Sequence, residues 1–152
     1  MKKIIYLMMA FATLTLLTGC NDKKYVGSKV EKTLSVLQNG ELVFEEKDVD
    51  WKIERNAEDG TYTLFMNKTH FVEAMPRLDM EVRGMVNQTT TTDFVFKYAT
   101  DATVPFYNGV EMPPYVMTNF LCEISISRNA QIRFSCAGHD VIYSEIWTDI
   151  YE

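Results

Sequence analysis

The sequence predicts an all-β domain, an antiparallel meander of about eight or nine strands that closes as a barrel or folds as a sandwich. Apolar residues recur with a period of two from Gly27 onward, which is typical of half-buried strands. Turn signals separate these segments, and no segment keeps the periodicity of a helix. We favour the barrel over the sandwich because closure removes exposed strand edges.

Two hairpins open the predicted sheet. Val30, Leu34 and Val36 share one parity, and Asn39-Gly40 after them is a strong hairpin signal. A second hairpin is predicted from the alternation that begins at Val49 and returns through residues 62–66. Later strands are expected at residues 78–82, 94–98, 116–127, 131–137 and 141–147. Segment 100–114 contains three of the four prolines and is predicted to be a long loop.

The first twenty residues predict export and lipid anchoring. Lys2 and Lys3 precede an apolar run at 4–17, which suits a signal peptide and is too short for a membrane span of ~20 residues. The run ends in Leu17-Thr18-Gly19-Cys20, which resembles the lipobox of bacterial lipoproteins. We therefore predict a signal peptide at 1–19 and a lipid on Cys20 that anchors the chain to a membrane. The alternative is an ordinary secretory signal with a chance cysteine.

The rest of the chain is predicted to be a short tether, 20–26, and one all-β domain, 27–152. The whole chain has 47% hydrophobic and 24% charged residues, in the range of folded soluble domains. Loss of Lys2 and Lys3 moves the formal net charge from -6 to -8. This acidity, with no basic cluster after the signal, argues against nucleic acid as a partner.

Two late cysteines are candidates for a disulfide. Cys122 and Cys136 each lie seven residues from Asn129, so a hairpin centred there would place them opposite each other. Directly paired antiparallel residues meet the spacing that a disulfide needs, and an exported compartment permits oxidation. The alternative is that both cysteines stay reduced on the core face.

The sequence contains no recognisable catalytic or metal-binding motif. His70 and His139 are the only histidines, and neither lies in a zinc-binding spacing. No serine lies in a nucleophile elbow, and no glycine-rich loop could cradle a phosphate. We therefore predict a protein that is not an enzyme, with no catalytic residue, metal or cofactor.

Three aromatic residues in or beside the proline-rich loop are the candidate contact residues. Phe106, Tyr107 and Tyr115 carry large rings that can bury much surface when a ligand or partner binds. The alternative is that the loop folds back and these rings plug an open end of the domain.

The mature chain also resembles a family of calycin-like, or lipocalin-like, lipoproteins of gut Gram-negative bacteria. The resemblance is carried by Tyr25-Val26-Gly27, Asp59-Gly60-Thr61-Tyr62-Thr63-Leu64, Met75-Pro76, Val82-Arg83-Gly84 and Ile132-Arg133-Phe134-Ser135-Cys136-Ala137-Gly138. It implies a β-barrel of lipocalin type and carries over no catalytic residue.

Two functional hypotheses follow. The first is an anchored, non-enzymatic barrel in the cell envelope, on the outer membrane, that holds a small apolar or amphipathic ligand in its interior. The second is an envelope interaction or structural module with a solid core, which binds a protein or glycan through its loops. An interior filled by Phe and Met side chains would argue against the first.

Overall fold

The computed structural model describes residues 23–47, 49–71, 75–92 and 94–152. The predicted signal peptide and Cys20 lie outside these ranges. The chain forms two compact units, one ending at Lys29 and including Asp149–Glu152, the other Val30–Thr148. Each is described by itself.

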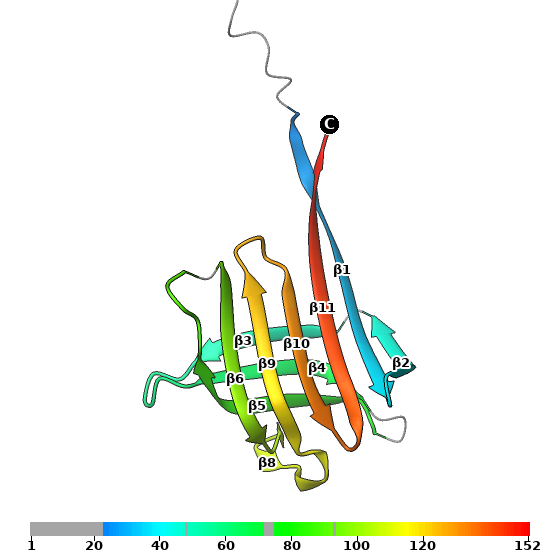
Figure 1. The fold of residues 1–152 in the computed structure, drawn as a ribbon, viewed down its shortest axis with the longest axis vertical. Helices are drawn as coiled ribbons and strands as arrows, with labels where there is room; N and C mark the ends of the chain where they lie inside the picture. The colour runs from blue at the N-terminus through cyan, green and yellow to red at the C-terminus, as the bar shows by residue number, and fades with distance from the viewer. Residues whose placement is uncertain (1–22, 48, 72–74, 93) are drawn as a thin grey trace, which may run out of the picture. The chain divides into compact units, whose positions relative to one another are not determined.

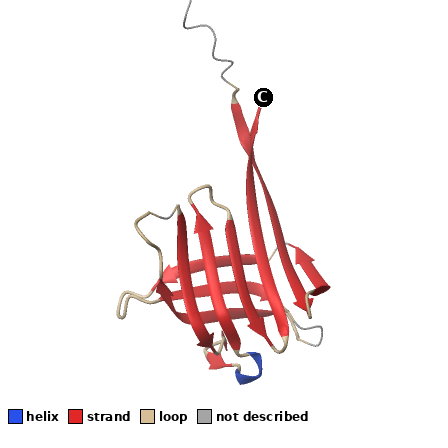
Figure 2. Ribbon diagram, in the orientation of Figure 1, coloured by secondary structure: helices blue, strands red, loops and turns tan. Residues whose placement is uncertain are grey.

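The structure is all-β and every strand pair for which a register is defined is antiparallel, as predicted. The elements are β1 (Tyr25–Gln38), β2 (Glu41–Lys47), β3 (Asp50–Arg55), β4 (Tyr62–Thr69), β5 (Leu78–Asn87), β6 (Val95–Thr103), β7 (Phe106–Tyr107), β8 (Val110–Glu111), a 3-10 turn η1 (Pro113–Tyr115), β9 (Met117–Ser125), β10 (Ala130–Cys136) and β11 (His139–Tyr151) (Figures 1 and 2).

The sheet is not closed among the described residues. Its strand order is β2-β1-β11-β10-β9-β6-β5-β4-β3, so β2 and β3 are the two ends of the path. Figure 1 shows β6, β9, β10 and β11 in one layer, with β3, β4 and β5 crossing behind them. This crossing is characteristic of sheets packed at steep angles. The predicted antiparallel all-β meander is confirmed, and its open path among the described residues is consistent with either a barrel or a sandwich.

Strand β5 carries the sheet from one layer into the other. Leu64 and Tyr62 of β4 pair with Val82 and Met85, so β5 has one extra residue at this point. Gly84 lies in the bulge with a φ of 76°, a conformation that glycine adopts without strain. Beyond the bulge, the last two residues of β5 pair with β6. The bulge therefore marks the corner between the layers.

The predicted first hairpin is confirmed and the predicted long loop is wrong. Asn39 and Gly40 both have positive φ between β1 and β2, as the Asn-Gly signal requires. Segment 100–114 instead contains a small hairpin, in which Phe106 pairs with Glu111 around Asn108 and Gly109. Asn108-Gly109 is the same turn signal as Asn39-Gly40, and both of its residues have positive φ.

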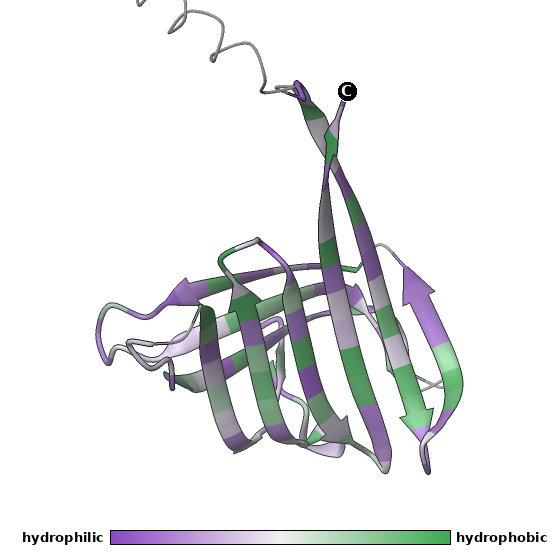
Figure 3. Ribbon diagram, turned by 45° about the horizontal axis from the view of Figure 1, so that its top comes forward, coloured by the Kyte–Doolittle hydropathy of each residue, from purple (hydrophilic) through white to green (hydrophobic). Residues whose placement is uncertain are grey.

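The interior is filled with side chains. Buried residues alternate with more exposed ones along β10 and the first half of β11. Figure 3 shows bands of hydrophobic and hydrophilic residues along the strands. The core cluster consists of Leu34, Val36, Val49, Leu64, Met66, Phe71, Met75, Met80, Val82, Met85, Met117, Phe120, Cys122, Ile132, Phe134, Cys136, Val141 and Tyr143. Phe134 is central to it, since its ring lies 5.3 Å from those of both Phe71 and Phe120.

Candidate functional site

The three predicted contact aromatics do not form one surface. Tyr115 packs on the core, with its ring edge-on to Phe71 at 6.1 Å. The Phe106 ring lies under the Arg83 guanidinium, 4.0 Å from its centroid. Tyr107 alone is exposed. Tyr115 therefore packs against the core, as the plug alternative expected. Of the three aromatic residues, only Tyr107 is exposed enough to contact a partner without a rearrangement.

The predicted pairing of the two late cysteines is wrong. Cys122 pairs with Ile132, and Cys136 pairs with Met117, five residues away along β9. At ~3.3 Å per residue, five residues separate the two cysteine backbones by roughly 17 Å along the strand, which is too far for a disulfide. Both cysteines are free and buried, as the alternative required. Burial raises the pKa of Cys122 to about 12 and that of Cys136 to about 11.

The error in register has two structural causes. Ile124 pairs with Ala130, so the β9–β10 turn is centred on Ser127 and not on Asn129. Arg128 adopts a φ of 71° in this turn, where no glycine marks the position. A bulge at Asn119, with a φ of 52°, then shifts β9 by one further residue.

A buried carboxylate at the β2 edge forms the first of two polar clusters that sequence reasoning missed. The Glu46 side chain is 7% exposed, and its Oε1 forms an ion pair with Arg77 Nη2, which lies 2.6 Å away. His70 Nδ1 lies 3.1 Å from Glu46 Oε2. The Phe44 ring lies over the imidazole at 4.5 Å. We call Glu46, His70 and Arg77 the edge cluster.

The edge cluster is incompletely hydrogen-bonded. Although His70 Nδ1 and Glu46 Oε2 are close, their geometry is not that of a hydrogen bond, and both buried atoms lack one within the described structure. The Arg77 side chain of the cluster remains 63% exposed.

A polar cavity of about 400 Å³ adjoins the edge cluster. Lys68 and Lys47 line it together with Arg77, while Glu45 and Glu46 supply negative charge. Such a mixed lining could hold a small polar group against the guanidinium. Because Glu46 already neutralises Arg77, the cavity offers an anion little net positive charge.

A second buried carboxylate lies on the core face of β11. Glu145 Oε2 accepts hydrogen bonds from Trp51 Nε1 at 2.9 Å and from the Tyr143 hydroxyl at 2.8 Å. Its Oε1 accepts one from Trp147 Nε1 at 2.6 Å. We call these four residues the indole cluster. Trp51 comes from β3, so the cluster joins the two layers of the sheet.

The chemistry of the indole cluster is structural. Three neutral donors satisfy the Glu145 carboxylate, which leaves little capacity for a ligand. The pKa of Tyr143 is raised, mainly by burial and to a smaller extent by the hydrogen bond to Glu145. The phenol therefore stays protonated and donates its hydrogen bond. The Arg128 guanidinium covers the Trp147 ring at 4.6 Å. A glutamate in the apolar face of β11 was the signal in the sequence.

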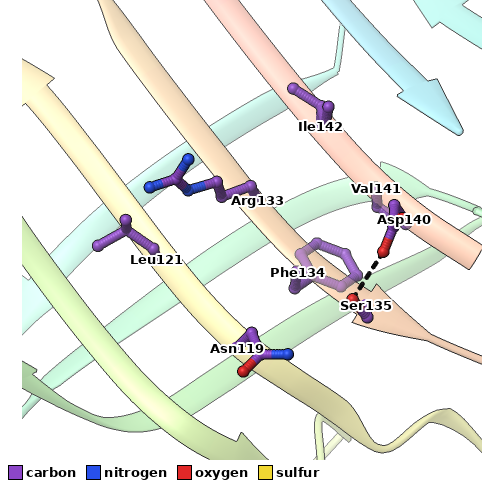
Figure 4. A pocket seen from close by; sticks show the side chains of 8 residues that line it. All are labelled: Asn119, Leu121, Arg133, Phe134, Ser135, Asp140, Val141 and Ile142. Carbon is purple, nitrogen blue, oxygen red and sulfur yellow. Dashed lines mark hydrogen bonds between the residues drawn. The ribbon is translucent and has the colours of Figure 1, made fainter. Parts of the chain in front are cut away.

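The outer face of the large layer carries a depression of about 430 Å³ (Figure 4). Its floor includes Leu121 and Ile142, and Arg133 lies between them on the central strand. Ser135 donates a hydrogen bond to Asp140 at one end, 2.7 Å away. It is a shallow surface feature, formed beside the β9 bulge, with no buried polar group aimed into it.

An exposed apolar patch lies at one end of the large layer. Phe94 is 74% exposed and Ile126 is 67% exposed, and Phe96 is exposed beside them. The Ile126 amide donates to the Phe94 carbonyl at 3.1 Å, so the two loops that carry them touch. We call these three residues the end patch. Phe94 lies just before β6, Ile126 lies just after β9, and Phe96 lies within β6.

Neither histidine lies in a recognisable catalytic arrangement. His139 is near the β10–β11 turn, with Nδ1 2.9 Å from the Ala137 carbonyl oxygen. Within the described ranges, no group of three or more His, Cys, Asp or Glu is placed to hold a metal ion. The described residues also include no helix long and apolar enough to span a membrane.

Comparison of the chain with protein-family models, curated proteins and solved structures finds no match. The resemblance to calycin-like lipoproteins therefore stays a prediction.

Proposed function

We propose that this chain is a membrane-anchored, non-enzymatic interaction module of the bacterial cell envelope, held by a lipid on Cys20. It would bind a partner through its loops and keep a solid core. The observation that carries this proposal is the filled interior, where methionine and phenylalanine side chains occupy the space between the layers.

The filled core favours this function over an interior ligand site. Met66, Met80, Met85 and Met117 are all fully buried between the two layers. A ligand of ordinary size would need 300–1,000 Å³ of pocket, and the depressions described above lie at the surface or the sheet edge. An interior ligand remains the second proposal, because flexible methionines can repack.

The end patch is the favoured contact surface. Phenylalanine and isoleucine have no hydrogen-bonding side-chain atoms, so the patch suits an apolar protein surface better than a glycan. Tyr107 is the only predicted contact aromatic left exposed, and it lies apart from this patch in sequence and strand pairing. We therefore place the partner contact at Phe94 and Ile126.

The partner contact can be tested by photo-crosslinking in cells. Benzoylphenylalanine replaces Phe94 in the full-length chain, and the same residue at Leu42, exposed on edge strand β2, is the control. We expect an adduct of one discrete mass from position 94 and none from position 42, and Ile126→Ser should abolish it. Equal adducts from both positions would contradict the assignment.

Two mass measurements test the rest of the proposal. The amino-terminal peptide of the protein isolated from membranes should carry acyl chains on Cys20, and an unmodified cysteine there would refute the anchor. Native mass spectrometry of the same protein should show no small molecule lost on denaturation. A lost mass would instead restore the interior ligand.

A further inference from the structure

The first unit is a narrow ribbon made from the start of β1 and the end of β11. Lys24 and Glu152 exchange both backbone hydrogen bonds, at 2.9 and 3.0 Å. The rings of Tyr25 and Tyr151 meet edge-on with centroids 5.8 Å apart. Ser28 donates to Asp149 at 2.7 Å. The ribbon is therefore held in a defined register.

Both faces of this ribbon are apolar at its tip. The Lys24–Glu152 pair places Tyr25 opposite Tyr151, and it places Val26 opposite Ile150 on the other face. All four side chains are exposed. A two-stranded ribbon has no second layer with which to bury even one face, let alone two. An environment that surrounds the tip on both sides would cover all four.

The sequence places this tip close to the predicted lipid. Cys20 precedes Tyr25 by five residues, and a fully extended chain of that length spans at most roughly 17 Å. If Cys20 is acylated, its backbone lies at the membrane surface. The tyrosine pair then cannot be further from the lipid headgroups than this short span permits.

We propose that the ribbon tip, formed by Tyr25, Val26, Ile150 and Tyr151, is a second membrane-contact site that lies among the lipid headgroups. The proposal rests on the lipid anchor at Cys20. Tyrosine favours the membrane interface because its ring is apolar and its hydroxyl stays hydrated. Two attachment points, the lipid on Cys20 and the ribbon tip, would restrict the orientation of the ribbon relative to the membrane surface.

Backbone chemistry limits the depth of insertion. A two-stranded ribbon has unpaired N–H and C=O groups along both outer edges, and these cannot be left unsatisfied in the hydrocarbon region. Lys24 and Glu152 also bring charge to the tip. The tip should therefore stay at headgroup level and should not reach the acyl-chain ends.

Charge contributes little to this contact. The described part of the unit holds Lys23, Lys24 and Lys29 against Asp149 and Glu152. This near balance offers weak attraction to anionic lipid, so the contact should depend on apolar burial and persist in high salt.

The test uses the full chain, purified from membranes with its lipid and reconstituted into vesicles of equal phosphatidylcholine and phosphatidylglycerol. Tyr25→Trp adds a fluorophore at the tip, and Tyr107→Trp is the matched control on an exposed hairpin. Lipids brominated near the headgroup end of the acyl chain should quench Tyr25→Trp at least about twofold more than Tyr107→Trp. Bromines near the chain end should quench it less.

Other outcomes would overturn the contact. Equal quenching of the two variants, loss of the difference in high salt, or a dimer cross-linked through the ribbon would each contradict it. Tyr151→Trp repeats the measurement from the other strand, in case the first variant disturbs the ribbon. An acylated Cys20 without quenching would refute this contact alone, whereas an unmodified Cys20 would refute the anchor.

Discussion

The two buried glutamates, Glu145 and Glu46, differ in the hydrogen-bond donors that surround them. Glu145 accepts three hydrogen bonds from two indoles and a phenol, and all three donors are neutral. Glu46 is as deeply buried but faces a largely exposed Arg77 and a histidine that makes no hydrogen bond to it. The difference teaches that burial alone does not define a role. The set of donors around a carboxylate decides whether it holds the fold or stays available.

The largest expected effect comes from removal of the fully bonded carboxylate. Glu145→Ala should lower the free energy of unfolding by about 2–4 kcal/mol, because it leaves buried indole and phenol donors without an acceptor. Chemical denaturation measures the change. Glu123→Ala, on the outer face of β9, is the control and should change stability by no more than about 0.5 kcal/mol. Equal losses would show that the indole cluster is not a structural centre.

Loss of a single donor should have a smaller effect with a distinct pH signature. Tyr143→Phe should cost about 1–2 kcal/mol at neutral pH, because one hydrogen bond to Glu145 is lost. Burial raises the pKa of Tyr143 in the folded state. Its contribution is thus complete below the unfolded pKa of ~10 and falls as pH rises above it, by up to about 1.4 kcal/mol per pH unit.

The effect of Tyr143 at alkaline pH is measured as the difference in free energy of unfolding between the wild type and Tyr143→Phe. Wild type and Tyr143→Phe share Cys122 and Cys136, whose pKa values are also raised, so the thiol contribution cancels when their stabilities are subtracted. The gap between the two proteins should narrow above pH 10. A constant gap would mean that Tyr143 does not titrate with unfolding.

The edge cluster should respond more weakly. Glu46→Gln keeps the size of the side chain and removes its charge, and we expect a loss of about 1 kcal/mol because Arg77 remains hydrated. Thermal unfolding measures it, with Glu45→Gln as the exposed neighbour. A loss as large as that of Glu145→Ala would erase the contrast between the clusters.

Arg77→Ala should have a still smaller effect on stability. The pair with Glu46 is exposed on the arginine side, and such pairs contribute about 0–1 kcal/mol. The loss should shrink further in high salt. A salt-independent loss would indicate that Arg77 acts through packing of its aliphatic stem instead.

A reducing agent should not change the stability of the folded protein. The free, separated thiols predict an unchanged unfolding midpoint with and without reductant. Alkylation at pH 8 should be slow until the chain unfolds, since the raised pKa values leave few thiolates. A lower midpoint in reductant would show that a disulfide forms after all.

Local pattern predicted the strands and failed on their long-range partners. Alternation determined which side chains share a face, and Asn39-Gly40 determined the first turn, because both depend on neighbours in sequence. The β9–β10 register depended on Arg128 and Asn119, which adopt positive φ without being glycine. Neither position has a following glycine that would mark a turn in the sequence.

The candidate sites were less predictable than the strands. The edge cluster joins Glu46 of β2 to His70 and Arg77, which lie at the two ends of the β4–β5 connection. That meeting depends on how the sheet folds over, which short-range periodicity does not encode. Glu145 could have been found, because a glutamate between Tyr143 and Trp147 breaks an otherwise aromatic face.

The position of β1 in the sheet has a consequence for how the domain assembles. β1 lies between β2, which follows it directly, and β11, which is about a hundred residues away. The first hairpin can form early, yet one edge of β1 remains unpaired until the last strand arrives. A growing chain therefore carries an open strand edge through most of its synthesis, and the domain should fold slowly, in milliseconds to seconds, after β11 has emerged. During that interval the unpaired edge of β1 can pair wrongly with other copies of the chain. Chaperones that keep the chain unfolded until β11 is available should therefore reduce its aggregation.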